Sequence, residues 1–152
     1  MNISLLKLNT IGVNMNKQDS VKIIEAFWAA VWQDKDFDAI ERFCVEDFVI
    51  TSGGVDVVSR ASFKAWAQQF NRLITDLKFD VIESFQSEDG SRVASRWRVS
   101  GRNNGMFGLP ADQREVSFTG TAVWQIREDG KLMHNWVERA SWEAYNSLVS
   151  RP

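Results

Sequence analysis

The sequence predicts an α+β fold in which helices cover one face of a curved antiparallel sheet. Apolar residues recur at helical spacing through the first half of the chain, between residues 19 and 74. Between residues 76 and 140, long segments rich in Val, Phe, Thr and Trp alternate with short turn sequences. Helices followed by an antiparallel meander are typical of two layers packed around one core.

Three helices are expected in the first half, at residues 19–33, 36–46 and 59–74. Each follows a residue type that commonly caps a helix N-terminus, and these are Asp19 or Ser20, Asp36 and Ser59. Apolar side chains at helical spacing should face the core, namely Val21, Ile24, Phe27 or Trp28 and Val31 in the first helix, Phe37, Ile40 and Phe43 in the second, and Phe63, Trp66, Phe70 and Leu73 in the third.

The strands are expected at residues 48–51, 76–86, 92–103, 115–126 and 131–140. Turn-forming residues separate them at 52–54, 87–90 and 128–130. A closing helix or helical turn is expected over residues 142–149. No repeat or low-complexity segment divides the chain, so residues 18–152 are expected to form one domain behind a flexible tail, residues 1–17. Met15 could be the true start.

Charge and composition exclude several classes of partner. The net charge of −2 gives no basic surface for nucleic acid. No apolar run is long enough to cross a membrane, and the chain start has no signal-peptide core, so a cytoplasmic protein is expected. One cysteine and one histidine cannot build a Cys/His metal cluster, and no metal or cofactor is expected. Cys44, in the predicted helical segment 43–45, is expected to be a small core residue.

Aromatic side chains are unusually frequent, with seven tryptophans and ten phenylalanines among 152 residues. They can simply fill a bulky core, or they can also form the wall of a cavity. The residues expected to line such a cavity are Phe27, Trp28, Trp32, Phe48, Trp66, Phe70, Trp97, Trp124 and Trp136. An apolar wall of this kind favours a ring-containing or isoprenoid-like metabolite over a sugar or nucleotide.

The order of these elements and three short segments resemble the SnoaL-like polyketide cyclase group of the NTF2-like superfamily. The segments are the glycine-rich loop at residues 101–110, the Gly-Lys-Leu turn at 130–132, and Trp136 in the last strand. The resemblance implies a cone of helices around a strongly bent sheet, with a central hydrophobic pocket. It also implies chemistry without metal or organic cofactor, and a homodimer that could form through the open sheet face.

The chain departs from the family pattern at the two positions that carry the cyclase acid/base pair. Asn103 stands where the resemblance places a catalytic histidine, and Ala140 stands where it places a catalytic aspartate. The glycine-proline loop is also one residue shorter. The usual pair is therefore absent, and fold alone does not settle the function.

Strand alternation supplies other candidate catalytic residues. His134, Trp136, Glu138 and Ala140 share one strand face, and Asn103 shares a face with Trp97. If these faces are concave, tryptophan rings would raise the pKa of Glu138 into a range useful for proton transfer. Alternatively, Glu138 pairs with an arginine, Arg96, Arg98 or Arg139, or faces solvent.

The other two candidates also have simpler interpretations. His134 could contribute an imidazole, or it could be a solvated residue at the sheet margin. Asn103 could polarise a substrate carbonyl, or it could be a turn residue of the glycine-rich loop. Met106, Phe107 and Leu109 form an apolar loop tip that could cover the pocket as a lid.

Two functional classes follow from these features. The first is a protein that binds a small polyketide- or terpenoid-like metabolite and acts as a cofactor-free cyclase or isomerase. The second is a non-catalytic ligand-binding or structural member that retains the pocket and has lost the family's catalytic His/Asp pair.

Overall fold

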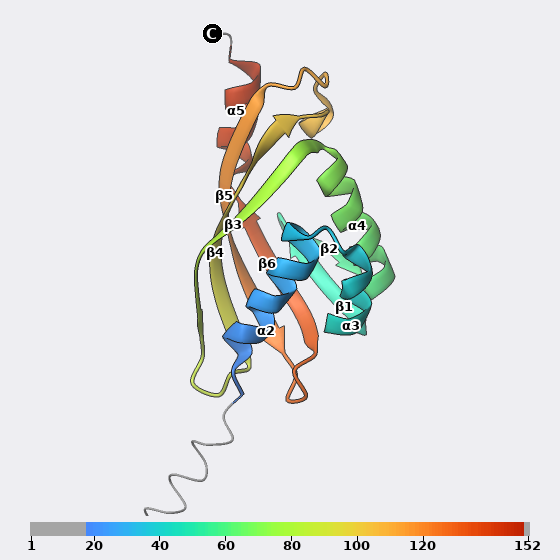
Figure 1. Cartoon of the computed structure of the whole chain (residues 1–152), viewed down its shortest axis with the longest axis vertical. Helices are drawn as coiled ribbons and strands as arrows, with labels where there is room; N and C mark the ends of the chain where they lie inside the picture. Colours follow the sequence, from blue (N-terminus) through green and yellow to red (C-terminus); the bar gives the residue numbers. More distant parts are fainter. Residues whose placement is uncertain (1–17, 151–152) are drawn as a thin grey trace, which may run out of the picture.

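The computed structural model describes residues 18–150, so the predicted tail and the choice between Met1 and Met15 lie outside the described residues. In chain order the elements are α2 (Ser20–Phe27), η1 (Trp28–Gln33), η2 (Phe37–Ala39), α3 (Ile40–Phe43), β1 (Cys44–Ser52), β2 (Val55–Val58), α4 (Arg60–Arg72), β3 (Ile74–Gln86), β4 (Arg92–Asn103), η3 (Met106–Gly108), β5 (Glu115–Ile126), β6 (Leu132–Arg139) and α5 (Ser141–Val149). Figure 1 shows this order along the chain.

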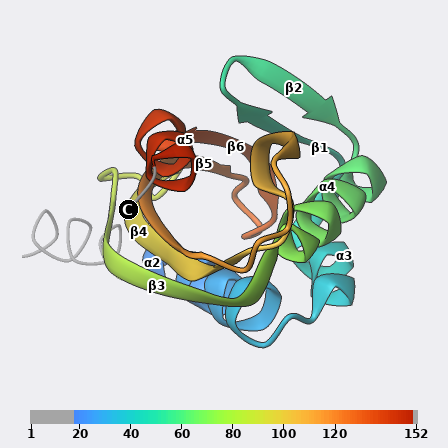
Figure 2. The same cartoon turned by 90° about the horizontal axis from the view of Figure 1, so that it is seen from above.

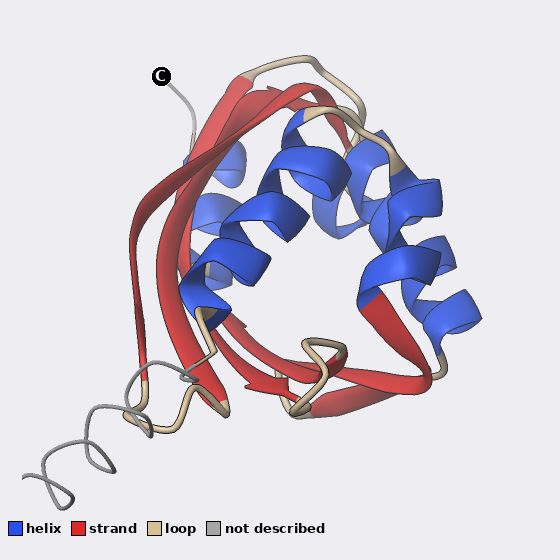
Figure 3. Cartoon of the chain, turned by 60° about the horizontal axis from the view of Figure 1, so that its bottom comes forward, coloured by secondary structure: helices blue, strands red, loops and turns tan. Residues whose placement is uncertain are grey.

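A single sheet of six strands, in the order β2-β1-β6-β5-β4-β3, forms the wall of the domain. Seen from above, β3 to β6 curve strongly around the interior (Figure 2). The helices lie on the concave side (Figure 3). The α+β prediction and the bent sheet are therefore confirmed. No helix among residues 18–150 is long and apolar enough to span a membrane.

The first helix changes geometry halfway along its length. Asp19 caps α2 by accepting a hydrogen bond from the backbone N–H of Lys22 at 3.2 Å. From Trp28 to Gln33 the backbone winds more widely, as a π-helix that ends with Asp34 N bonded to Ala29 O at 2.9 Å. Segments of this kind occur often at functional sites. Here the wide turn carries Trp28 and Trp32, which are both buried.

The predicted boundaries fail in the segment after the second helix. That helix ends at Phe43, and Cys44 begins β1 instead of continuing the helix. Cys44 is nevertheless a core residue, and burial raises the pKa of its thiol to about 12. The prediction missed β2, a short strand at the sheet edge that pairs with β1 across the Gly53-Gly54 turn. It also missed the parallel pairing of β1 with β6, so the sheet is mixed rather than wholly antiparallel.

A bulge in β6 decides which of its side chains face the concave side. Ile126 pairs with Leu132 and Gln125 pairs with His134, so Met133 is an extra residue on β6. An extra residue reverses the alternation beyond it. Asn135 and Val137 are therefore buried, whereas Trp136 and Glu138 are exposed on the outer face. The expected inward orientation of His134, Trp136 and Glu138 is wrong for this reason.

The core is largely aromatic, with Trp124 at its centre. This side chain is 0% exposed, and its ring centroid lies 4.9 Å from that of Phe27 and 5.3 Å from that of Trp28. Phe48 packs beside it, at 6.3 Å between centroids. These rings join α2 and β1 to the middle of the sheet. Phe27, Phe48 and Trp124 line neither of the chambers described below, so here the aromatic residues fill the core.

Candidate functional site

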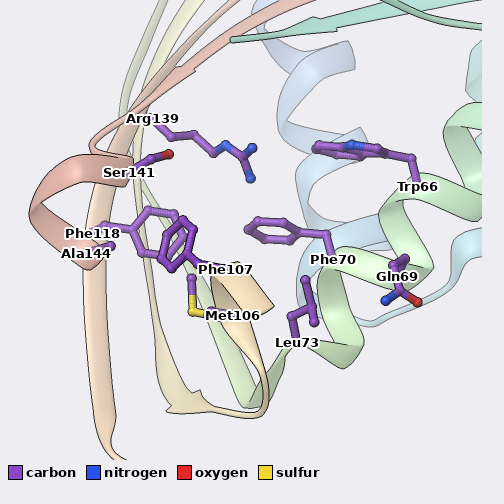
Figure 4. A pocket seen from close by; sticks show the side chains of 10 residues that line it. All are labelled: Trp66, Gln69, Phe70, Leu73, Met106, Phe107, Phe118, Arg139, Ser141 and Ala144. Atoms are coloured by element: carbon purple, nitrogen blue, oxygen red, sulfur yellow. The ribbon is translucent and has the colours of Figure 1, made fainter. Parts of the chain in front are cut away.

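A cavity of about 220 Å³ opens between α4, α5, the 106–108 turn and the concave side of the sheet. Its lining is mainly apolar, and Figure 4 shows the side chains that form it, namely Trp66, Gln69, Phe70, Leu73, Met106, Phe107, Phe118, Arg139, Ser141 and Ala144. We call this space the outer chamber. Trp66 and Phe70 reach it from one face of α4, and Leu73, the C-cap residue of that helix, continues the same stripe at helical spacing.

A smaller space of about 30 Å³, the inner chamber, lies deeper in the domain. It shares Trp66, Phe70 and Arg139 with the outer chamber. Its other lining residues are Trp28, Trp32, Ile50, Phe63, Phe79, Trp97, Val99, Asn135 and Val137. The shared residues therefore stand at the junction of the two chambers, which we treat as one site.

Gly120 is the reason that Trp97 can lie against the sheet and line the inner chamber. The two residues are direct partners in the β4–β5 ladder. A Cβ atom at Gly120 would lie 2.2 Å from the Trp97 ring, closer than any real contact. The indole thus occupies space that any other residue at this position would fill.

Arg139 places a positive charge at the junction of the chambers. Its guanidinium lies over the rings of Trp66 and Phe70, at 5.6 and 5.0 Å from their centroids. It donates a hydrogen bond to Ser52 Oγ at 3.1 Å. Burial lowers the pKa of Arg139 from its ordinary value, but an arginine remains protonated in proteins. In Figure 4 its head group points into the space between α5 and α4.

Three residues that line the inner chamber each have a buried polar atom with no hydrogen-bond partner among residues 18–150. These atoms are the indole nitrogens of Trp28 and Trp97 and the side-chain oxygen of Asn135. These three residues are at most 4% exposed. An unsatisfied buried polar group costs about 1–3 kcal/mol, so the wall of the inner chamber is less stable than a fully hydrogen-bonded one.

The aromatic residues that were predicted to bind ligand separate into three groups. Trp28, Trp32, Trp66, Phe70 and Trp97 line a chamber. Phe48 and Trp124 lie in the core, and Trp136 lies on the outer face of the sheet with 36% of its surface exposed. Ligand binding by the first group stays a prediction. The loop tip also reaches the site, because Met106 and Phe107 line the outer chamber.

Asn103 is predicted to polarise a substrate, but its side chain makes hydrogen bonds within the glycine-rich loop. It is 0% exposed and lines neither chamber. Its Nδ2 donates to Pro110 O and to Asp112 Oδ1, both at 3.0 Å. Its Oδ1 accepts from the backbone N–H groups of Gly105 and Met106, at 3.1 and 2.8 Å. The turn interpretation of Asn103 is the one that this geometry supports.

His134 forms part of a cluster on the outer face. Its Nε2 lies 2.8 Å from Thr51 Oγ1, which in turn donates to Asp56 Oδ1 at 2.6 Å. Its ring stacks on Trp136 with centroids 3.8 Å apart. Partial burial lowers the pKa of His134, helped by Arg92 and opposed by Asp56. The cluster lies across the sheet from both chambers.

Glu138 is exposed on the same outer face and lines neither chamber. We therefore do not place Glu138 in the site. The sequence indicates its neighbour Arg139 only as an ion-pair partner for Glu138. One signal could have revealed its inward orientation, since the apolar Leu132 and Val137 differ in parity and so indicate a bulge between them.

No metal-binding group can be assembled around this site from the described part of the chain. Within residues 18–150, no set of three or more His, Cys, Asp or Glu side chains comes close enough together to hold a metal ion. The polar groups of the two chambers are instead an arginine, indoles, amides and one hydroxyl.

Comparison with known proteins supports the fold assignment. Residues 24–135 match the family model of the SnoaL-like domain. Among curated proteins, no sequence matches this chain. A protein described as a SnoaL-like polyketide cyclase from Jannaschia sp. CCS1 superposes with a TM-score of 0.79 at 14% identity, over 88% of this chain and 93% of that one.

Two further solved structures are similar in the same way. A protein described as a polyketide cyclase from Xanthomonas campestris pv. campestris gives a TM-score of 0.75 at 24% identity, over 89% of this chain and 99% of that one. IdmH from Streptomyces antibioticus, also described as a polyketide cyclase, gives 0.74 at 17% identity, over 88% and 100%. At these identities the likeness shows the fold alone.

Proposed function

Because the chain belongs to the SnoaL-like domain family, as its sequence resemblance predicted, we propose that it binds a small hydrophobic metabolite in the two chambers. The observation that carries this proposal is the mainly apolar outer chamber of about 220 Å³. Drug-sized ligands occupy pockets of about 300–1,000 Å³, so a smaller ring compound fits this space better. The relatives described as polyketide cyclases favour a polyketide- or terpenoid-like ring system.

The lining of the chambers favours binding over acid/base catalysis. General acid/base catalysis requires a group that gives or takes a proton near neutral pH, most often a histidine or a carboxylate. No histidine, aspartate or glutamate lines either chamber as the described residues form them. We therefore prefer the ligand-binding class over a cyclase or isomerase that works through Glu138, His134 and Asn103.

Binding can be measured by tryptophan fluorescence, because Trp28, Trp32, Trp66 and Trp97 all line the chambers. Titration with bicyclic and monoterpenoid ring compounds should change the emission and saturate. Ala144→Phe should weaken binding at least about tenfold, which is ~1.4 kcal/mol, because the new ring occupies the outer chamber.

The matched control is Glu143→Phe, which adds the same ring to an exposed position on the same helix. It should leave affinity unchanged. Saturable binding that Ala144→Phe does not weaken would place the ligand elsewhere. A diverse panel that gives no response at all would contradict the proposal and indicate a filled core.

We also propose that the protein forms a homodimer through the outer face of the sheet. Register pairs Phe85 with Ala94, Ala94 with Val123, and Val123 with Trp136, so these side chains form one row across four strands. Phe85, Val123 and Trp136 are exposed by 60, 38 and 36%. A contiguous exposed apolar surface is typical of an interaction site.

Val123→Glu should dissociate this dimer, because it places a carboxylate in the middle of the apolar row. Sedimentation velocity at micromolar concentration should show twice the chain mass for the unaltered protein and the single chain mass for the variant. Ser117→Glu is the control, since Ser117 is exposed nearer the other end of the same strand. An unaltered protein that sediments only as a single chain would contradict the dimer.

A further inference from the structure

Arg139 is the only charged residue that lines the two chambers as the described residues form them. No aspartate or glutamate among residues 18–150 forms an ion pair with it, although eight other ion pairs occur in that part of the chain. Its protein contacts are one hydroxyl, Ser52 Oγ, and the faces of two aromatic rings. The site therefore holds a positive charge without a negative one.

These contacts leave most of the hydrogen-bonding capacity of Arg139 unused. A guanidinium has five N–H donors in a planar fork, and the hydrogen bond of Arg139 to Ser52 uses one of them. The rings of Trp66 and Phe70 attract the cation through their faces but accept no conventional hydrogen bond. A carboxylate matches the fork with two parallel charge-assisted hydrogen bonds, which are about twice as strong as neutral ones.

The inner chamber beside Arg139 favours an oxygen-bearing group in the same place. An indole N–H can only donate, so Trp28 and Trp97 both require an acceptor. The unpartnered atom of Asn135 is its Oδ1, an acceptor that a carboxylate does not satisfy, so only the two indole nitrogens favour an acceptor here. A space of about 30 Å³ holds a group of the size of a carboxylate but not a ring system.

We propose that the ligand of this protein is a ring-containing carboxylic acid, whose carboxylate binds Arg139 at the junction of the chambers while its apolar ring body occupies the outer chamber. This inference rests on the proposed function, since it specifies the chemical class of the metabolite. It makes Arg139 the residue that determines specificity for an anionic ligand.

The test compares decalin-2-carboxylate with decalin-2-carboxamide by isothermal titration calorimetry at pH 7.5. The two probes share the ring body and differ in charge. The unaltered protein should bind the carboxylate more tightly. Arg139→Met keeps a similar chain length without the charge, and it should reduce affinity for the carboxylate about 10- to 100-fold, the scale of a hydrogen bond to a charged group. Its affinity for the carboxamide should change much less.

Arg98→Met is the control, because Arg98 is exposed on the outer face of β4 and should leave both affinities unchanged. Arg139→Lys keeps the charge without the fork and should lose less carboxylate affinity than Arg139→Met. The comparison of the two probes on the unaltered protein stands even if a variant at this position does not fold.

Two results would overturn the inference while the proposed function survives. One is equal binding of carboxylate and carboxamide by the unaltered protein. The other is an Arg139→Met variant that loses affinity for both probes to the same degree. Arg139 would then contribute to the shape of the chamber and not to recognition of a negative charge. If neither probe binds the unaltered protein, the inference fails, and the titration with the diverse panel of ring compounds decides whether the hydrophobic-ligand proposal fails with it.

Discussion

Trp124→Ala should destabilise the folded protein by about 3–5 kcal/mol, the range for removing a large aromatic side chain from a core. Trp124 is 0% exposed, and its ring contacts those of Phe27, Trp28 and Phe48. Its loss would leave a cavity between α2 and the sheet. Urea denaturation followed by circular dichroism measures the change in the free energy of unfolding.

Trp142→Ala is the matched control, because Trp142 is 68% exposed on α5. Its free energy of unfolding should differ from that of the unaltered protein by no more than about 0.5 kcal/mol. Equal destabilisation by the two variants would show that Trp124 does not join the layers as described. The two variants also distinguish the contribution of a core tryptophan from that of a surface tryptophan.

Asn103→Ala should cost about 2–4 kcal/mol, because it removes hydrogen bonds to Pro110, Asp112, Gly105 and Met106 together. The N–H of Met106 would be left buried without its acceptor, which adds a desolvation cost. The loop that carries Met106 and Phe107 at the outer chamber should loosen as well. A thermal melt gives the stability change, and hydrogen exchange of the loop amides gives its local consequence.

Asn104→Ala is the natural comparison, since the neighbouring side chain is exposed and its hydrogen bonds to Arg72 and Gln113 lie at the surface. It should cost less than about 1 kcal/mol. An Asn103→Ala variant with unchanged stability and abolished ligand binding would reverse our assignment and return Asn103 to the site.

Local sequence signals were sufficient to predict the strands that have turn sequences at both ends. The predicted strands at 92–103 and 115–126 coincide with β4 and β5, because turn sequences and β-branched and aromatic residues mark both ends. The boundary at Cys44 was less predictable. The apolar segment around it suits a helix or a strand, and only pairing with β6, far along the chain, selects the strand.

The site was harder to predict than the fold because it depends on contacts between distant elements. Trp66 and Phe70 lie on a regular helical stripe, so their place in the wall follows from spacing. The role of Trp124 as core rather than wall depends on which rings reach it from α2 and β1. Arg139 faces the chambers and Glu138 faces outward, contrary to the prediction, because a strict two-residue period does not reveal a single extra residue in β6.

That extra residue, Met133, has an evolutionary consequence. The far end of β6 carries two sets of side chains, one with Asn135, Val137 and Arg139 and the other with Trp136 and Glu138. Insertion or deletion of one residue near the Gly130 turn exchanges the set that faces the chambers. A single-codon length change in this hairpin could thus convert a cation-bearing cavity into a carboxylate-bearing one, without any substitution between Asn135 and Arg139.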